Sequence, residues 1–376
     1  MKKSWIHQIR GWTPVNPPRG LKDKHEEQLT RQGFMGPVAS LFRPHDPGLP
    51  FRVEGDLRAR AVEAYALPSL DGADERAEPI ELLKNDELIV ATSRRTKAMP
   101  YCYRNAVADR LYFVHRGVGV IATEFGPISY EPGDYIMLPK GVTFRHLPAS
   151  DDGFFLVIES KSPIGLTEHE QVGRHMPFDL TLLEPPTITP YDWPEQEEWE
   201  IRIKHATGFT SAFYRECPFN VVGWKGDLYP FKINVRSIMP LMSERIHLVP
   251  TSWATFQNDS FMVATFLPQV GVSDMETDEF PPNHRSIDAD EVFLVHGGGA
   301  PGAFMHTPQG ITHGATAERR AAFNAIRTPE FRRTLTAINI DAYRPLQPTE
   351  AFRSLDGGGQ IQPAKVLRNL DEPAKF

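Results

Sequence analysis

Two histidines and one glutamate stand close together near the C-terminal end of the chain, within residues 283–314. Glu291 lies seven positions after His284, and His313 follows beyond a glycine-rich stretch. Two neutral imidazoles and one carboxylate, with the other coordination positions left open, are the ligand set typical of non-haem Fe(II) oxygenases. We therefore predict that His284, Glu291 and His313 are the ligands of an Fe(II) ion.

The residues around these three predict a pair of β-strands that brings them together. Val292–Val295 has the composition of a strand and is followed by a glycine-rich turn. Pro308 fixes φ in the next turn, and Gly310 accepts a φ that other residues disfavour. Because inward-facing side chains of neighbouring barrel strands meet in the interior, we expect the three candidate ligands to converge inside a β-barrel.

The spacing in this region resembles that of the two cupin motifs, G(x)5HxH(x)3-4E(x)6G and G(x)5PxG(x)2H. His284 falls on the first histidine of the first motif, whereas Ser286 replaces the second one. The remaining positions that fit the two motifs are Glu291, Gly298, Gly302, Pro308, Gly310 and His313. The alternative interpretation, three ordinary polar residues of the core or surface, is disfavoured because so many positions coincide.

An internal repeat indicates that the chain contains two such barrels. Residues 109–117 (DRLYFVHRG) align without a gap with residues 290–298 (DEVFLVHGG). The spacing of Gly133, Pro139 and Gly141 likewise repeats the spacing of Gly302, Pro308 and Gly310. Two copies of one pattern predict two related barrels.

The first copy of the repeat lacks the candidate ligands. Tyr103, Arg110 and Phe144 stand where the second copy has its first histidine, its glutamate and its second histidine. An arginine does not ligate a cation, and a phenylalanine has no lone pair to offer. We therefore expect the first barrel to be structural and free of metal.

The composition favours β-structure and an intracellular, reduced setting. The chain of 376 residues has 34 prolines, 28 glycines and many short Val/Ile/Phe/Tyr runs, which favour sandwiches or barrels over helices. The expected fold class is all-β, a bicupin of two related barrels or jelly rolls with an N-terminal arm and a short C-terminal helix. Cys102 and Cys217 are the only cysteines, so no disulfide framework is expected and a cytoplasmic location is the simplest interpretation.

The charge and hydropathy of the chain exclude two classes of partner. The net charge of −7 provides no basic surface for nucleic acid. No apolar run approaches the roughly 20 residues that span a bilayer, so we expect no membrane partner. The first residues carry two lysines without a following apolar stretch and are not expected to form a secretory signal.

The sequence also predicts how the chain is divided. The expected regions are an arm with strands over 1–80, a first barrel without ligands over 81–165, a connection over 166–200, the metal-binding barrel over 201–320, and a helix with a tail over 321–376. The helix itself is expected over 317–337, which is basic and rich in alanine. The arm, rich in proline and glycine, either wraps a neighbouring subunit or lies on its own barrel.

Several segments resemble the homogentisate 1,2-dioxygenase family. Residues 217–230, CPFNVVGWKGDLYP, are similar to the CPFNVVxWxGxxxP signature of that family. Residues 28–41 and 105–126, and the sequence PPNHR at 281–285, also look like the family. The resemblance extends from about residue 25 to about residue 350.

This resemblance implies an Fe(II)-dependent, extradiol-type dioxygenase that uses O2 to open the ring of homogentisate or a related 2,5-dihydroxyaromatic compound, in tyrosine and phenylalanine catabolism. The iron ligands of the family match His284, Glu291 and His313. The histidine that acts as base in the family corresponds by position to His247, which taken alone resembles a core histidine, and another corresponds to His306. Members of the family assemble as trimers and dimers of trimers, so a homo-oligomer is expected.

The chain departs from the family in the segment that helps to seat the substrate. Between Glu291 and His313 it contains no arginine, lysine or tyrosine, and Pro282-Asn283 replaces an aromatic pair before the first metal histidine. The acidic arm of the substrate therefore needs another anchor, either Arg285 or an arginine from another segment or subunit. Homogentisate, hydroquinone and a gentisate-like ring remain alternative substrates.

Two other functions fit the same barrel. A zinc- or manganese-dependent isomerase or decarboxylase is one of them, although such cupins usually have a third histidine at the position of Ser286. A non-catalytic, ligand-binding bicupin is the other, although it has no need for a metal-ligand set that survives in one barrel only.

Overall fold

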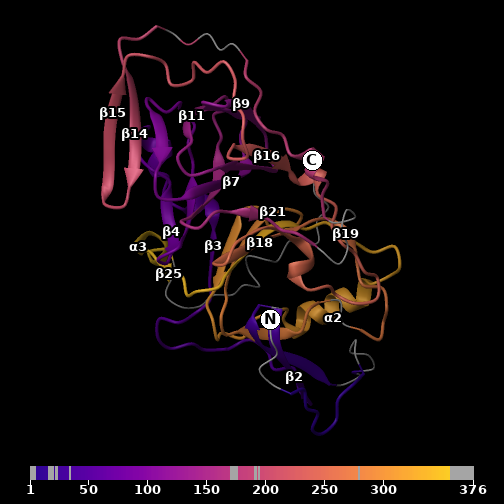
Figure 1. The fold of residues 1–376 in the computed structure, drawn as a ribbon. Helices are drawn as coiled ribbons and strands as arrows, with labels where there is room; N and C mark the ends of the chain where they lie inside the picture. Colours follow the sequence, from indigo (N-terminus) through magenta and orange to yellow (C-terminus); the bar gives the residue numbers. More distant parts are fainter. Residues whose placement is uncertain are drawn as a thin grey trace.

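The chain folds into β-sheets that form two barrels, as the computed structural model shows (Figure 1). The structure describes residues 6–15, 21, 24–33, 35–169, 177–189, 193, 195–277 and 280–355. The all-β bicupin expected from the sequence is confirmed, with an N-terminal hairpin and a short helix in the C-terminal half. Among the described residues, no helix is long and apolar enough to cross a membrane.

The first barrel is made of two sheets. One contains, in spatial order, β16 (Phe231–Asn234), β10 (Asp134–Leu138), β7 (Asp109–Arg116), β12 (Phe154–Ser160), β5 (Leu88–Ser93), β4 (Ile80–Lys84) and β25 (Gln347–Pro348). The other contains β15 (Gly208–Tyr214), β14 (Trp199–His205), β6 (Cys102–Asn105), β11 (Thr143–Pro148), β8 (Gly119–Thr123) and β9 (Gly126–Tyr130).

The second barrel also has one large sheet, together with smaller ones. The large sheet contains β13 (Gly165–Leu166), β17 (Ala254–Gln257), β18 (Phe261–Phe266), β24 (Thr336–Ala342), β21 (Asp290–Gly297), β22 (Ala303–Thr307) and β3 (Arg60–Glu63). The smaller sheets are β2 (Met35–Arg43), β1 (His25–Gln32) and β20 (Asn283–Ser286), and the pair β19 (Gln269–Val270) and β23 (Arg332–Arg333).

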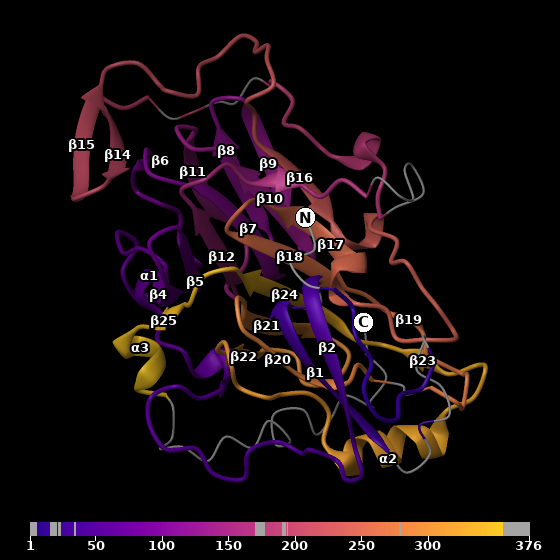
Figure 2. The same cartoon turned by 60° about the horizontal axis from the view of Figure 1, so that its bottom comes forward.

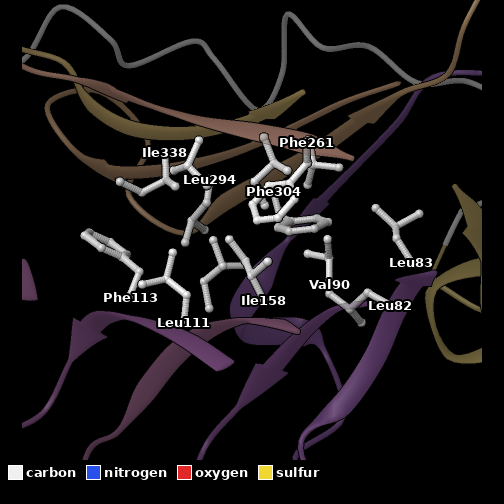
Figure 3. Close-up of a cluster of buried hydrophobic side chains, with 14 of the residues drawn as sticks. Leu82, Leu83, Val90, Leu111, Phe113, Ile158, Phe261, Leu294, Phe304 and Ile338 are labelled. Carbon is white, nitrogen blue, oxygen red and sulfur yellow. The ribbon is translucent and has the colours of Figure 1, made fainter. Parts of the chain in front are cut away.

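The two barrels pack against each other through their large sheets (Figure 3). Leu111 and Phe113 of β7 meet Leu294 of β21 and Ile338 of β24 in this layer, and all four are buried. Because side chains alternate along a strand, the residue between the two on β7, Tyr112, points instead into the first barrel. Full burial of such apolar side chains contributes about 1.5–3 kcal/mol each, so this layer holds the barrels together.

Each barrel also receives a strand from the far end of the chain. β3 pairs with β22 of the second barrel, although it precedes every strand of the first barrel. β25, one of the last elements of the described chain, pairs with β4 of the first barrel. The two barrels are therefore joined by strand exchange as well as by their apolar layer.

The internal repeat reappears in the hydrogen bonds that fix the barrel strands. Asp109 and Asp290 occupy equivalent positions, and each carboxylate accepts two backbone N–H groups. The donors are Lys140 at 2.7 Å and Ile164 at 2.8 Å for Asp109, and Gln309 at 3.0 Å and Leu346 at 2.9 Å for Asp290. The repeated aspartate thus holds a turn and a later segment at the same place in both barrels.

The second barrel does not have the boundaries expected from the sequence, 201–320. β14, β15 and β16 extend the sheets of the first barrel, and β24, which follows residue 320, is a central strand of the second. These assignments depend on pairings between distant segments, such as the parallel pairing of β14 with β6. Local periodicity does not reveal such pairings.

The strands β1 and β2 of the N-terminal arm lie on their own barrel, which is one of the two alternatives that the sequence left open. β1 and β2 form a hairpin beside β20 (Figure 2). β1 pairs in parallel with β20, and the backbone N–H of Ile287 donates to the carbonyl of Thr30 over 3.0 Å. The hairpin therefore completes the second barrel next to His284.

The helix expected over 317–337 is shorter than predicted. α2 (Ala317–Ile326) begins as expected, because the Thr316 hydroxyl accepts the backbone N–H of Arg319 over 3.2 Å and caps the first turn. It ends before Pro329, because a proline disfavours helical geometry in the residue that precedes it. The other α-helices of the described chain, α1 (Leu70–Ala73) and α3 (Glu350–Arg353), have one turn each, and residues 356–376 of the expected tail lie outside the described residues.

Candidate metal centre

His284, Glu291 and His313 come together in the second barrel. One ligand atom of each residue lies within 4.8 Å of the other two. His284 lies on β20 and Glu291 on β21, and the backbone of His313 pairs with that of His284 through two hydrogen bonds of 2.9 Å. The strand pairing therefore places the two imidazoles side by side, with ring centroids 4.1 Å apart.

The two imidazoles are oriented by the backbone. Nδ1 of His284 donates to the carbonyl of Pro282 over 3.1 Å, and Nδ1 of His313 donates to the carbonyl of Ile311 over 3.0 Å. Hydrogen bonding at one ring nitrogen fixes the ring and leaves the other nitrogen for a metal. Both Nε2 atoms then face Glu291, at 3.2 Å from its Oε1 for His284 and 3.0 Å from its Oε2 for His313.

The arrangement fits a divalent cation. Nε2 of His313 is buried and lies 3.0 Å from Oε2 of Glu291, but the geometry is not that of a hydrogen bond. Two imidazole nitrogens and one carboxylate that converge on one point are a ligand set for Fe, with open positions left for other molecules. The structure thus brings together the three residues that the sequence singled out.

The electrostatics of the three residues favour positive charge between them. Burial raises the pKa of Glu291, but the neighbouring His313 and His284 outweigh burial and hold it well below its ordinary value. For His313, burial lowers the pKa, and the Glu291 carboxylate more than compensates and raises it. For His284, burial and the charge of His313 lower the pKa. The same charge distribution would favour a cation bound between the three residues.

A second carboxylate, which sequence reasoning missed, faces the same interior. Asp341 of β24 is the strand partner of Glu291 and is only 4% exposed. Burial and the Glu291 charge raise the pKa of Asp341 to about 8, and the side-chain amide of Asn339 donates to its Oδ1 over 2.8 Å. The available signal was the pair of polar residues at alternate positions of the apolar strand TAINIDA.

His247 lies in the segment between β16 and β17, near the candidate metal ligands. Its ring meets Trp253 edge to face, with centroids 5.8 Å apart. Burial holds the pKa of His247 well below its ordinary value, and the charges of Arg333, Arg320 and His284 lower it further. Its imidazole is therefore neutral at physiological pH.

The structure does not bring His306 to the candidate metal ligands. The partner of His306 on β21 is Val292, which faces the apolar layer between the barrels, so His306 points away from the barrel interior. Its Nε2 lies 2.9 Å from Oδ2 of Asp290, and its ring packs near Phe352. These contacts are those of a buried structural histidine.

Arg285 is also turned away from the metal ligands. It follows His284 on β20, and successive side chains of a strand point to opposite faces. Its guanidinium pairs with the buried carboxylate of Glu27 on β1. The substrate anchor considered for Arg285 therefore does not fit the observed geometry.

In the first barrel, a guanidinium stands where the second barrel has the candidate ligand Glu291. Tyr103 and Phe144 are backbone partners, as His284 and His313 are. The guanidinium of Arg110 lies over the Tyr103 ring, 4.5 Å from its centroid, and donates to the Tyr103 hydroxyl over 2.8 Å. A buried cation of the protein itself thus occupies the centre of this barrel.

The chain is similar to known proteins along most of its length. Residues 77–235 match the family described as homogentisate 1,2-dioxygenase N-terminal, a match that covers the first barrel and ends before the candidate ligands. A Saccharolobus solfataricus protein named "Putative dioxygenase" is 28% identical over 266 residues, which are 65% of this chain and 68% of that protein. A homogentisate 1,2-dioxygenase of Nitrobacter hamburgensis is 24% identical over 221 residues, 56% of this chain and 48% of that protein.

The chain thus spans about two thirds of the length of the first relative and about half of the second. Among solved structures, a cupin 2 conserved barrel domain protein from Leptotrichia buccalis has a TM-score of 0.38 and 10% identity, covering 76% of this chain and 97% of its own. The family match and the relatives confirm that this chain resembles the homogentisate 1,2-dioxygenase family.

Proposed function

We propose that the protein is an Fe(II)-dependent dioxygenase that opens the ring of a dihydroxyaromatic compound with O2. The observation that carries this proposal is the convergence of His284, Glu291 and His313 inside a barrel of a chain that resembles homogentisate 1,2-dioxygenases. Fe(II), when bound there, supplies Lewis acidity to a phenolic oxygen and the electrons for O2 chemistry.

The chain itself prepares the site for such an ion. The carbonyl groups of Pro282 and Ile311 hold both imidazoles with Nε2 inward, and Glu291 supplies the negative charge. Apolar side chains line the same barrel, among them the buried Trp253 and Met262. A ring bound here is sheltered from bulk water, which strengthens its electrostatic contacts with the protein.

His247 is the residue that receives a proton from the substrate in this proposal. A neutral imidazole has a free lone pair that accepts a hydrogen bond from a ring hydroxyl. Because burial and the nearby arginines keep His247 neutral, it is ready to accept rather than to donate. General-base assistance of this kind contributes about 10²–10⁴-fold to a rate.

The substrate proposed first is homogentisate, a ring with an acidic arm. Arg333 and Arg320 are the charges that act on His247, so an anionic substituent is favoured on that side of the site. Arg320 is held beside His284, because its guanidinium donates to the carbonyl of Pro281 and to the side-chain oxygen of Asn283, both over 2.9 Å. Gentisate also carries an acidic group, whereas hydroquinone carries none.

An oxygen-electrode assay of the Fe(II)-loaded protein tests the proposal. We expect O2 consumption with homogentisate or gentisate, and less with hydroquinone. His284→Ala is the matched control, because it removes one ligand and leaves the rest of the site. The proposal fails if none of the three compounds supports O2 uptake, or if the His284→Ala protein consumes O2 as fast as the wild type.

We also propose that the protein is a homo-oligomer, a trimer or a hexamer. β2 is the edge strand of its sheet, with residues 36–40 exposed to solvent. A long exposed edge strand offers unpaired backbone groups to another chain. Light scattering coupled to gel filtration tests this, and a mass equal to that of one chain at micromolar concentration would contradict it.

A further inference from the structure

Strand pairing makes two buried carboxylates equivalent in the two barrels. In the first barrel, Glu159 on β12 is the partner of Arg110 on β7. In the second barrel, Asp341 on β24 is the partner of Glu291 on β21. Because Arg110 and Glu291 occupy the same position of the repeat, Glu159 and Asp341 do so as well.

In the first barrel, this carboxylate compensates a buried cation. Oε1 of Glu159 accepts a hydrogen bond of 2.8 Å from Nε of Arg110, and its Oε2 lies 2.6 Å from Nζ of Lys204. The guanidinium of Arg110 stands between Tyr103 and Phe144, the counterparts of the two histidine ligands. Positive charge at the barrel centre is therefore matched by a carboxylate from the neighbouring strand.

In the second barrel, the same strand position carries a carboxylate, and the described residues show no such ion pair with it. None of the ion pairs among the described residues joins Asp341 or Glu291 to a lysine or arginine. Two carboxyl groups that face one interior repel each other when both are ionised, and a cation between them removes that repulsion. The second barrel thus has the carboxylate at this position, whereas the first barrel has both the carboxylate and the cation that it compensates.

We propose that Asp341 belongs to the metal centre as an additional carboxylate, which strengthens the binding of a divalent cation to His284, Glu291 and His313 without ligating it directly. Asp341 lies outside the set of atoms that converge within 4.8 Å, so it acts across space, as a carboxylate that a cation bound beside it keeps ionised. The side-chain amide of Asn339 donates a hydrogen bond to Oδ1 of Asp341. Gly33 of the N-terminal hairpin packs against Oδ2, since a Cβ added at Gly33 would lie 3.0 Å from that oxygen. This inference rests on the proposed metal site.

The test is the affinity of the metal-free protein for Co(II), measured by competition with a chromophoric chelator. Asp341→Asn keeps the shape and removes the charge, Asp341→Glu keeps the charge, and Asp288→Asn removes a partly exposed carboxylate elsewhere in the same barrel. Loss of a residue that supports metal ligands weakens metal binding by about 10–100-fold. We expect such a loss for Asp341→Asn, and affinity near that of the wild type for Asp341→Glu and Asp288→Asn.

A thermal scan of the metal-free proteins separates charge from structure. If Asp341 acts through its charge, Asp341→Asn leaves the metal-free protein at least as stable as the wild type, because a buried carboxyl group next to Glu291 is removed. The inference is overturned if Asp341→Asn binds Co(II) as tightly as the wild type, or if it weakens binding only by destabilising the metal-free fold. His284→Ala distinguishes a failure of this inference from a failure of the proposed metal site, because undiminished Co(II) binding in that variant would refute the metal site itself.

Discussion

Replacing Arg110 by methionine should destabilise the first barrel without affecting the metal centre. The guanidinium is buried and makes hydrogen bonds to four side chains, at 2.8 Å from Glu159, 2.8 Å from the Tyr103 hydroxyl, 3.0 Å from the Tyr112 hydroxyl and 3.3 Å from Glu78. Methionine fills a similar apolar volume but leaves these acceptors without their donor. The change therefore isolates the charge that stands in the place of a metal.

The magnitude follows from what remains around the carboxylate. Removal of one partner of a buried ion pair costs about 3–5 kcal/mol. Lys204 stays 2.6 Å from Glu159 in the variant, so we expect the lower end, about 3 kcal/mol, which is roughly a 100-fold increase in the unfolded-to-folded ratio. Glu159→Gln should cost more, nearer about 5 kcal/mol, because among the described ion pairs it leaves the guanidinium with Glu78, at 3.3 Å, as its one carboxylate partner.

Urea unfolding at pH 7, followed by tryptophan fluorescence, measures these differences. The double variant Arg110→Met/Glu159→Gln should lose less than the sum of the single losses, because the two groups interact directly. Metal content should equal that of the wild type in all three proteins. A loss below about 0.5 kcal/mol for Arg110→Met, the range of ordinary surface substitutions, would refute the assignment of this guanidinium as a compensated internal charge.

The pKa values of the buried histidines and the charges near His247 give three further predictions. His247→Ala should keep its metal but lose about 10²–10⁴-fold in O2 uptake, and unchanged turnover would return it to the role of a core histidine. Burial lowers the pKa of His115 to about 3 and of His296 to about 4. Because the unfolded chain binds protons at these groups below about pH 6.5, the free energy of unfolding should fall by up to about 1.4 kcal/mol per pH unit for each group as the pH drops from 6.5 toward 4. Replacing both histidines by phenylalanine should flatten this pH dependence in urea unfolding. Arg333→Ala should raise the KM for homogentisate more than that for hydroquinone, and equal effects on both would argue against an anionic substrate arm.

The convergence of the three candidate metal ligands was predictable because their signal is local. His284, Glu291 and His313 lie within one short stretch, and their spacing with the glycines and Pro308 fixes two strands and a turn. The loss of the candidate ligands from the first copy of the repeat, where Arg110 replaces the glutamate, was predictable for the same reason. The resemblance to one family then added a candidate base and a candidate reaction.

The errors came from strand parity and from long-range pairing. Arg285 directly follows a ligand on β20, so its side chain must point to the opposite face, and alternation alone was sufficient to exclude it. His306 required the register of β22 against β21, which the sequence does not supply. Asp341 was missed because only the pairing of β24 with β21 places it opposite Glu291.

The metal content of the purified protein tests the central claim most directly. Elemental analysis should find iron in the wild type after reconstitution with Fe(II), and none above background in His284→Ala or His313→Ala, with all three proteins equally folded by circular dichroism. Iron retained at the wild-type level by either variant would contradict the account.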